Sequence, residues 1–294
     1  MTLKETYAKK AEKVDDVLQK ILKKTVGDFT PENVHDIRTS IRRFQSAYKA
    51  LPKKVRTKRG VRKYKDSCTA LFKVLNEMRD YDVILSRLSS YPESNALKDA
   101  KSFVRKKREY LETRARKRAL SLRDDAKKLK FGSFSDSQFD KRLEVQLEVQ
   151  ARKMRDDLLV VWTGRTKKDE LHGLRKDCKK LRYMLELKEE KYGKQMNVLK
   201  EWQGYLGTVH DIEMTELVLR NRNKRGSLDS ILKEEESKAK ENYDKFMTRS
   251  RSGETRAVID SLFPDVLKPQ ISSKPVLTGT EGGTQTNKRG NSTS

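Results

Sequence analysis

The sequence predicts an all-α protein, and three observations support this fold class. Apolar residues recur at helical spacing through most of the chain. Only 14 of its 294 residues are glycine and 6 are proline, so long stretches contain no helix breaker. Apolar residues make up 34% of the chain and charged residues 38%, so the core must be thin and spread along amphipathic helices.

Four helices are expected in the first half of the chain, over residues 3–24, 31–51, 61–89 and 94–130. Gly27 ends the first of them. Thr30 is the expected N-cap of the second, Pro31 its first residue and Pro52 its stop. A basic connection is expected over residues 55–60, and residues 132–136 break the pattern.

The second half repeats this scheme. Helices are expected over residues 137–161, 168–191 and 194–222, with a break at Gly164. Gly226 and Ser227 introduce a last long helix that runs to about residue 251, and a short helix is expected over residues 255–262. After Phe263 the composition turns polar, which is typical of a disordered tail. The predicted units are therefore residues 1–132, 133–263 and 264–294.

Composition also narrows the function. The chain has 68 Lys and Arg residues against 43 Asp and Glu residues, a formal charge of +25, which favours an anionic partner. Cys68 and Cys178 lack the spacing of a disulfide framework or a zinc site. No apolar run is long enough for a membrane span, and the N-terminus does not have the pattern of a signal peptide. We therefore expect a cytoplasmic protein without membrane association.

Two predicted helices carry the same pattern of charged residues. His35 and Arg38 precede Arg42-Arg43 with the spacing at which His172 and Arg175 precede Lys179-Lys180. On a helix His172, Arg175, Lys179 and Arg182 fall within a wedge of roughly 80° and form one cationic stripe. An apolar stripe lies beside the cations in each helix and is expected to pack inward: Val34, Ile37, Ile41, Phe44 and Tyr48, and Leu171, Leu174, Cys178, Leu181 and Leu185.

A second matched pair of segments lies one helix later in each half. Residues 75–80, Leu-Asn-Glu-Met-Arg-Asp, align with residues 206–211, Leu-Gly-Thr-Val-His-Asp. All three histidines of the chain thus occupy repeat-matched positions. The repetition predicts an internal duplication, with two halves of about four helices that face one another across a pseudo-twofold axis.

These four segments, in this order and spacing, resemble the CHAD family, the conserved histidine α-helical domain. The resemblance covers roughly residues 1–250 and is closest in the second half; the first half departs from it at Asn76, where the family often has glycine. It implies two four-helix bundles that enclose a basic groove or pore and bind inorganic polyphosphate. The N-terminal triphosphate-tunnel strand of some members is not seen, so a stand-alone binding module is expected.

The cationic stripes suit a repeating anion, because arginine offers a planar fork to two phosphate oxygens and lysine a point charge. One edge of the fourth helix is a candidate extension of the groove. Asp80, Asp82, Asp211 and Glu213 are expected to orient the arginines. The candidate polyphosphate-binding residues are His35, Arg38, Arg42, Arg43, Arg79, Lys101, Arg105, Arg108, His172, Arg175, Lys176, Lys179, Arg182 and His210.

Several alternatives remain open at this stage. The histidines are phosphate donors or structural residues, and a metal role is disfavoured because no two ligands stand in close helical register. Nucleic-acid binding is the second candidate function, although few aromatic residues accompany the cations. A metal-dependent phosphohydrolase or accessory module is the third, but no P-loop is present. We expect no catalytic residue, cofactor, metal or protein partner, and a location that includes polyphosphate granules.

Overall fold

The computed structural model describes residues 29–163 and 168–262, and residues 5, 9, 10, 12, 13 and 16 before them. All regular structure within these residues is helical, so the predicted fold class is confirmed. Of the predicted first helix, over residues 3–24, only those six residues are described. The expected break at Gly164 and the expected tail over residues 264–294 lie outside the described residues.

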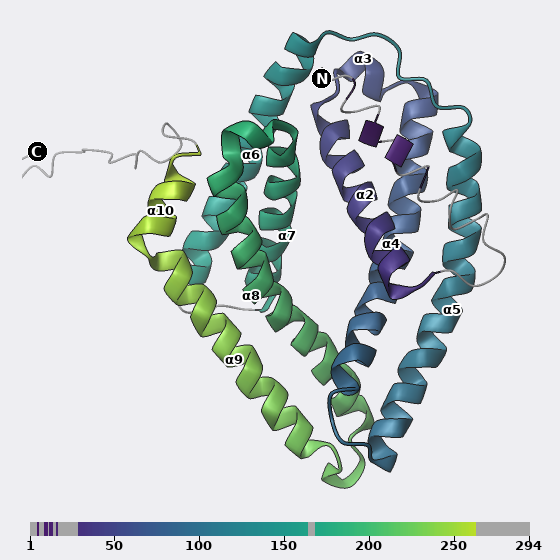
Figure 1. The fold of residues 1–294 in the computed structure, drawn as a ribbon, viewed down its shortest axis with the longest axis vertical. Helices are drawn as coiled ribbons and strands as arrows, with labels where there is room; N and C mark the ends of the chain where they lie inside the picture. The colour runs from purple at the N-terminus through teal and green to yellow at the C-terminus, as the bar shows by residue number, and fades with distance from the viewer. Residues whose placement is uncertain are drawn as a thin grey trace, which may run out of the picture.

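Three long helices and one short helix make up the described first half (Figure 1): α2 (Pro31–Ala50), α3 (Lys53–Arg56), α4 (Arg59–Leu88) and α5 (Asn95–Ala126). The predicted start of α2 is confirmed, because the Thr30 hydroxyl accepts a hydrogen bond from the Asn33 backbone N–H at 3.2 Å. The basic connection predicted over residues 55–60 is wrong, since α3 and the first turn of α4 occupy most of it. Helix α5 ends four residues before the predicted end.

The second half contains α6 (Asp136–Trp162), α7 (Lys168–Leu185), α8 (Glu189–Arg222), α9 (Asp229–Arg251) and α10 (Gly253–Asp260). The helix predicted over residues 168–191 ends earlier, and a short 3-10 helix at Glu186–Lys188 leads into α8. Helix α8 is bent near its start, where Tyr192 has a φ of −122° and a ψ of 24°. The other expected helices of this half are confirmed to within a few residues.

The two halves share their apolar core. The larger core cluster joins Ile37 and Phe44 of α2 with Leu174 and Leu181 of α7 and Trp202 of α8, all fully or almost fully buried. This confirms that the apolar stripes predicted for α2 and α7 pack inward. A second cluster joins the ends of α4 and α5 with α8 and α9, where the two groups of helices converge in Figure 1. The internal duplication and its twofold axis remain predictions.

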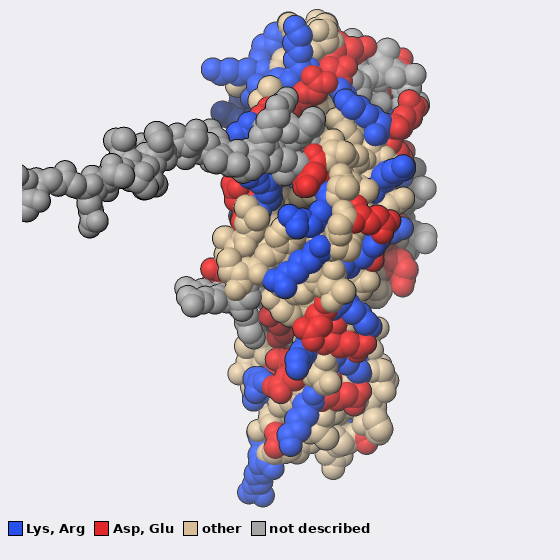
Figure 2. Space-filling model, turned by 90° about the vertical axis from the view of Figure 1, so that its left-hand side faces the viewer, with Lys and Arg blue, Asp and Glu red and all other residues tan. Residues whose placement is uncertain are grey.

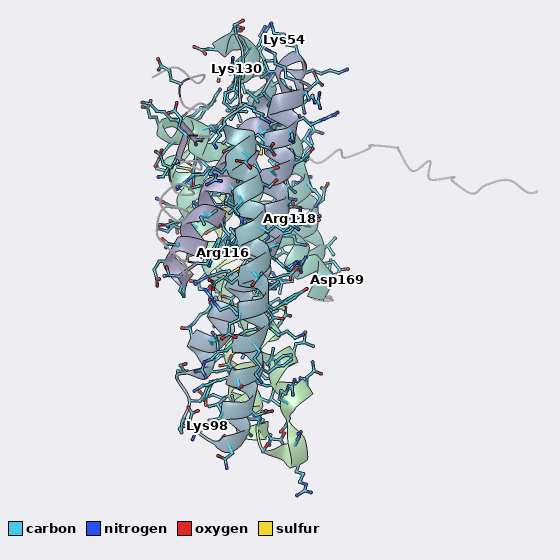
Figure 3. All side chains as sticks on the ribbon, turned by 90° about the vertical axis from the view of Figure 1, so that its right-hand side faces the viewer. Lys54, Lys98, Arg116, Arg118, Lys130 and Asp169 are labelled. Carbon is cyan, nitrogen blue, oxygen red and sulfur yellow. The ribbon has the colours of Figure 1, made fainter. Side chains whose placement is uncertain are left out.

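Charged residues of both signs cover the outer surface. On the side of the molecule drawn in Figure 2, acidic and basic side chains are interspersed and no large area of one sign stands out. On the opposite side, Arg116 and Arg118 extend from the outer face of α5 (Figure 3). None of the helices in the described ranges is long and apolar enough to cross a lipid bilayer.

Candidate functional site

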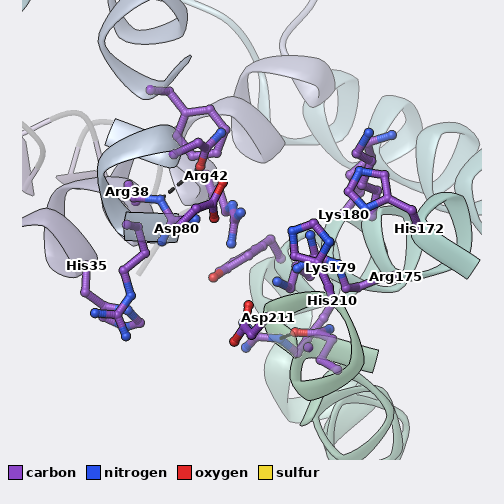
Figure 4. A pocket seen from close by; sticks show the side chains of 18 of the residues that line it. His35, Arg38, Arg42, Asp80, His172, Arg175, Lys179, Lys180, His210 and Asp211 are labelled. Carbon is purple, nitrogen blue, oxygen red and sulfur yellow. Dashed lines mark hydrogen bonds between the residues drawn. The ribbon is translucent and has the colours of Figure 1, made fainter. Parts of the chain in front are cut away.

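A cavity of about 840 Å³ lies between the two halves, and four helices line it. Helices α2 and α4 of the first half form one wall, and α7 and α8 of the second half form the other. In Figure 4, His35, Arg38 and Asp80 of the first wall face Arg175 and Lys179 of the second across the open space. The cationic edges of the two matched helices therefore point toward one shared space.

The lining of this cavity is strongly positive. Among the described residues, only two carboxylates belong to it, Asp80 and Asp211, together with the three histidines His35, His172 and His210. Ten lysine and arginine residues line it: Arg38, Arg42, Lys49, Arg79, Arg175, Lys176, Lys179, Lys180, Arg182 and Lys200. Such a concentration of like charge raises the free energy of the ligand-free cavity and favours an anion within it.

Most of the candidate residues predicted from the sequence line the cavity. The ten that do are His35, Arg38, Arg42, Arg79, His172, Arg175, Lys176, Lys179, Arg182 and His210. Their positions follow from the helical register, because the buried apolar stripes of α2 and α7 fix the direction in which the neighbouring cations point. The structure thus brings the two matched segments of each half together at one site.

The remaining four candidates lie elsewhere. Arg43 pairs with Glu186 at 2.8 Å, on the side of α2 that faces the short 3-10 helix. Lys101 is buried and pairs with Glu93 at 2.7 Å, and Arg105 is exposed to solvent. The expected extension of the groove along α5 is therefore wrong, because none of these side chains reaches the cavity.

Arg108, the fourth, belongs to a structural clamp. Its Nε donates to Asp82 Oδ1 at 2.5 Å, and its Nη2 donates to the backbone carbonyl of Phe29, directly before α2. The Asp82 side chain is only 2% exposed. Arg108 therefore ties α5 to α4 and to the start of α2. Asp82, which was expected to orient a cavity arginine, holds Arg108 instead.

The matched arginines Arg38 and Arg175 differ in how they are held. The Arg38 Nε donates to Asn76 Oδ1 at 2.9 Å. In the other half the position matched to Asn76 is Gly207, and the Nε of Arg175 is buried without a hydrogen-bond partner. The departure from the repeat at Asn76 therefore has a structural consequence: one arginine is anchored, while the other keeps an unsatisfied donor at the cavity.

Lys179 stands at the centre of this electrostatic arrangement. It is partly buried, and within the described chain it forms no ion pair. Burial, followed by the neighbouring cations Arg175, Arg42 and Arg38, lowers the pKa of Lys179 to about 6, against the opposing effect of Asp211. Near pH 7 the amine is therefore mostly neutral when no anion is bound.

The two carboxylates of the lining partly balance the arginines. The pKa of Asp80 is raised to about 6, because burial and then the charge of Asp211 raise it more than Arg38, Arg175 and Lys179 lower it. The pKa of Asp211 is also raised by burial. Burial lowers the pKa of Arg38 to about 10, with Arg42 as the next cause. Asp80 and Asp211 thus partly offset the positive charge of the arginines. The expectation that Asp80, Asp211 and Glu213 orient the arginines stays a prediction.

Two of the three histidines are in contact with each other. The rings of His172 and His210 have centroids 4.9 Å apart. Burial, followed by the charges of Arg175 and His172, lowers the pKa of His210 to about 3. The pKa values of His35 and His172 are lowered too, first by burial and then by nearby cations. All three imidazoles are therefore neutral near pH 7 in the ligand-free protein.

Guanidinium groups lie over both aromatic rings of the lining. The Arg42 Cζ is 5.2 Å from the centroid of the Phe72 ring, and the Arg182 Cζ is 4.4 Å from that of Tyr183. Arg182 is also held by Glu186 at 2.7 Å and by Gln203 at 3.0 Å. These rings help to orient the cations, and one ring face of each is already occupied.

Three lysines of the lining were not among the candidates: Lys49, Lys180 and Lys200. Lys49 follows Arg42 by two helical turns, so continuing the register of the stripe along α2 would have identified it. Lys180 directly follows Lys179 and pairs with Asp177 at 2.9 Å. Lys200 lies on α8 before the matched segment and carries no repeat signal.

The difference between Asn76 and Gly207 leads to a test by a single substitution. A Cβ atom added at Gly207 would have no neighbour within 4 Å, so the backbone position accepts a side chain, and Gly207→Asn tests the role of this difference. We expect the new amide to accept a hydrogen bond from Arg175, as Asn76 does from Arg38, and to weaken anion binding by about tenfold, the worth of one hydrogen bond. Calorimetric titration with polyphosphate measures the change. Gly207→Ala is the control, and an equal loss in both variants would contradict this explanation.

The sequence and the fold of this chain are similar to those of known proteins. The family model described as CHAD domain matches residues 12–220. Among solved structures, the chain is similar to the CHAD domain from the plant Ricinus communis, with 17% sequence identity, a TM-score of 0.49, and coverage of 87% of this chain and 90% of that one. A search of curated proteins found no match. Because the family model spans more than half of the sequence, this chain belongs to the CHAD domain family.

Proposed function

We propose that this protein binds inorganic polyphosphate in the cavity between its two halves and does not react with it. The observation that carries the proposal is the cavity lining, in which ten lysines and arginines surround two carboxylates. Arg175 keeps a buried donor without a partner, and Lys179 has no ion pair in the described part of the chain. A chain of phosphates would supply acceptors to both.

The arrangement of the cations favours an extended anion over a single phosphate. Cations line both walls, from Arg38 and Arg42 on one side to Arg175 and Lys179 on the other, and they continue along α2 to Lys49. One phosphate group cannot contact all of them at hydrogen-bond distance. A polymer with a charge on every unit can neutralise several cations at once, and each neutralised pair releases counterions.

Nucleic acid fits the site less well. Duplex DNA carries its phosphates on the outside of a wide, stiff rod, which suits an exposed surface or an inserted helix better than an enclosed cavity. Single strands are usually bound by stacking of bases on aromatic rings. Here a guanidinium group covers a face of both Phe72 and Tyr183.

Competition between the two polyanions tests the proposal. Labelled polyphosphate bound to the protein at about 0.15 M salt should be displaced by unlabelled polyphosphate but hardly by duplex or single-stranded DNA at the same phosphate concentration. Displacement by DNA at equal phosphate would transfer the assignment to nucleic acid. The failure of polyphosphate to bind at all would refute the proposed function.

We also propose that the protein does not hydrolyse the polyphosphate that it binds. Incubation of the complex with Mg²⁺ or Mn²⁺ should release no phosphate beyond the uncatalysed background, whereas release at ordinary enzyme rates would make the protein a hydrolase.

We place the protein in the cytoplasm, at polyphosphate granules where the cell forms them. A fluorescent fusion that stayed away from granules in such cells would contradict this location.

A further inference from the structure

The groups that surround Lys179 suggest how ligand binding is regulated. Lys179 lines the cavity together with charged or titratable groups from all four lining helices, and these groups affect its charge. These groups are Arg38 and Arg42 on α2, Asp80 on α4, His172 and Arg175 on α7, and His210 and Asp211 on α8. Three of the seven are guanidinium groups, which stay charged at neutral pH and oppose a further positive charge at Lys179.

We infer, on the basis of the proposed function, that the cavity takes up protons together with its polyanion and that the Lys179 amine is the main acceptor. A polyanion beside Arg175 and Arg42 cancels the repulsion that keeps Lys179 neutral. The protonated amine then contributes a charged hydrogen bond to the ligand. Ligand binding therefore converts the neutral Lys179 amine into a cation, which in turn binds the ligand.

Every other titratable group of the site changes in the same direction. Without ligand, the pKa values of His172 and His210 are lowered by burial and by neighbouring cations, so an arriving anion raises them. The pKa of Asp80 is already raised to about 6 by burial, and a second anion nearby raises it further. None of the seven groups named around Lys179 releases a proton to compensate, so binding and protonation reinforce each other.

The affinity for polyphosphate is expected to fall as the pH rises above neutrality. The pKa of Lys179 is about 6 without ligand and moves toward the usual value of lysine when the anion is bound. Between these values the complex holds one more proton than the free protein. Affinity is therefore expected to fall by about tenfold for each unit of pH rise from about 7 to 9. The protein would bind polyphosphate tightly in neutral or mildly acidic conditions and release it in alkaline ones.

Calorimetry detects this proton directly. Wild-type protein is titrated with polyphosphate at one pH in Tris and in PIPES, two buffers whose ionisation enthalpies differ. The difference in observed binding enthalpy between the buffers gives the number of protons taken up, which we expect to be about one or more. An enthalpy that is the same in both buffers, with full binding, would overturn the inference and leave the proposed function intact.

Lys179→Arg separates a proton acceptor from a structural cation. Arginine keeps the charge but stays protonated in the free protein, so binding should persist while proton uptake falls by about one and the pH dependence between 7 and 9 flattens. Lys106→Arg is the matched control, because Lys106 is exposed on α5 outside the cavity, and its uptake should equal that of wild type. Equal uptake in Lys179→Arg and wild type would refute Lys179 as the acceptor. Absence of binding to wild type at every pH would overturn the proposed function as well.

Discussion

The triple variant Arg42→Gln/Arg175→Gln/Lys179→Gln is expected to bind polyphosphate at least about 100-fold more weakly than wild type. Each of these cations lines the cavity and lacks an ion pair in the described chain, so each is available to the ligand. A hydrogen bond to a charged group contributes about 1.5–3 kcal/mol, and three of them are removed. The slope of log affinity against log salt should also shrink by about 1.4, since Arg42 and Arg175 contribute about 0.7 each and Lys179 is mostly neutral in the free protein.

A matched triple variant removes three cations from the surface of α5, outside the cavity. Arg105, Lys106 and Arg118 are exposed on α5, away from the cavity, and their triple change to glutamine should leave affinity close to that of wild type. Helical circular dichroism should be unchanged in both variants, because the apolar stripes are untouched. If both variants lost affinity equally, the general charge of the protein and not the cavity would hold the ligand.

Arg108→Met is expected to destabilise the fold by about 3–5 kcal/mol without changing affinity. The substitution leaves the Asp82 carboxylate buried without its partner and frees the Phe29 carbonyl, and breaking a buried ion pair from one side carries a cost of this size. Urea unfolding measures the loss, and polyphosphate titration of the folded variant measures the affinity.

The neighbouring Arg105→Met is the control, because Arg105 lies on the same helix but is exposed. It should leave both stability and affinity near those of wild type. Reduced affinity with unchanged stability in Arg108→Met would assign Arg108 to the ligand after all, as its basic helical neighbours first indicated.

Much of this fold could be predicted from the sequence because its signals are local. The spacing of Val34, Ile37 and Ile41 fixes which face of α2 is buried, and Thr30 with Pro31 marks its start. The ends of the helices were less predictable from the sequence. Helix α7 stops at Leu185 although helix-forming residues follow, because a short 3-10 turn places Glu186 between Arg43 and Arg182. Such a contact between distant segments leaves no local signal.

The candidate site was predictable where it follows a repeat. His35 and Arg38 were found because His172 and Arg175 repeat their spacing, and the register of the helices carries both pairs to the cavity. Lys101 and Arg108 were assigned to the ligand by charge and spacing alone. Their carboxylate partners, Glu93 and Asp82, come from the loop before α5 and from α4, and spacing along one helix does not reveal them.

The shared core also limits how far the two walls of the cavity can move relative to each other. Each apolar cluster contains residues of both halves, from Ile37 with Leu174 in the larger one to Leu97 with Leu219 in the smaller. The two walls of the cavity therefore cannot separate by a hinge motion without exposing packed side chains to water. If polyphosphate is the ligand, it enters a preorganised cavity, and we expect most of the conformational entropy lost on association to come from the phosphate chain.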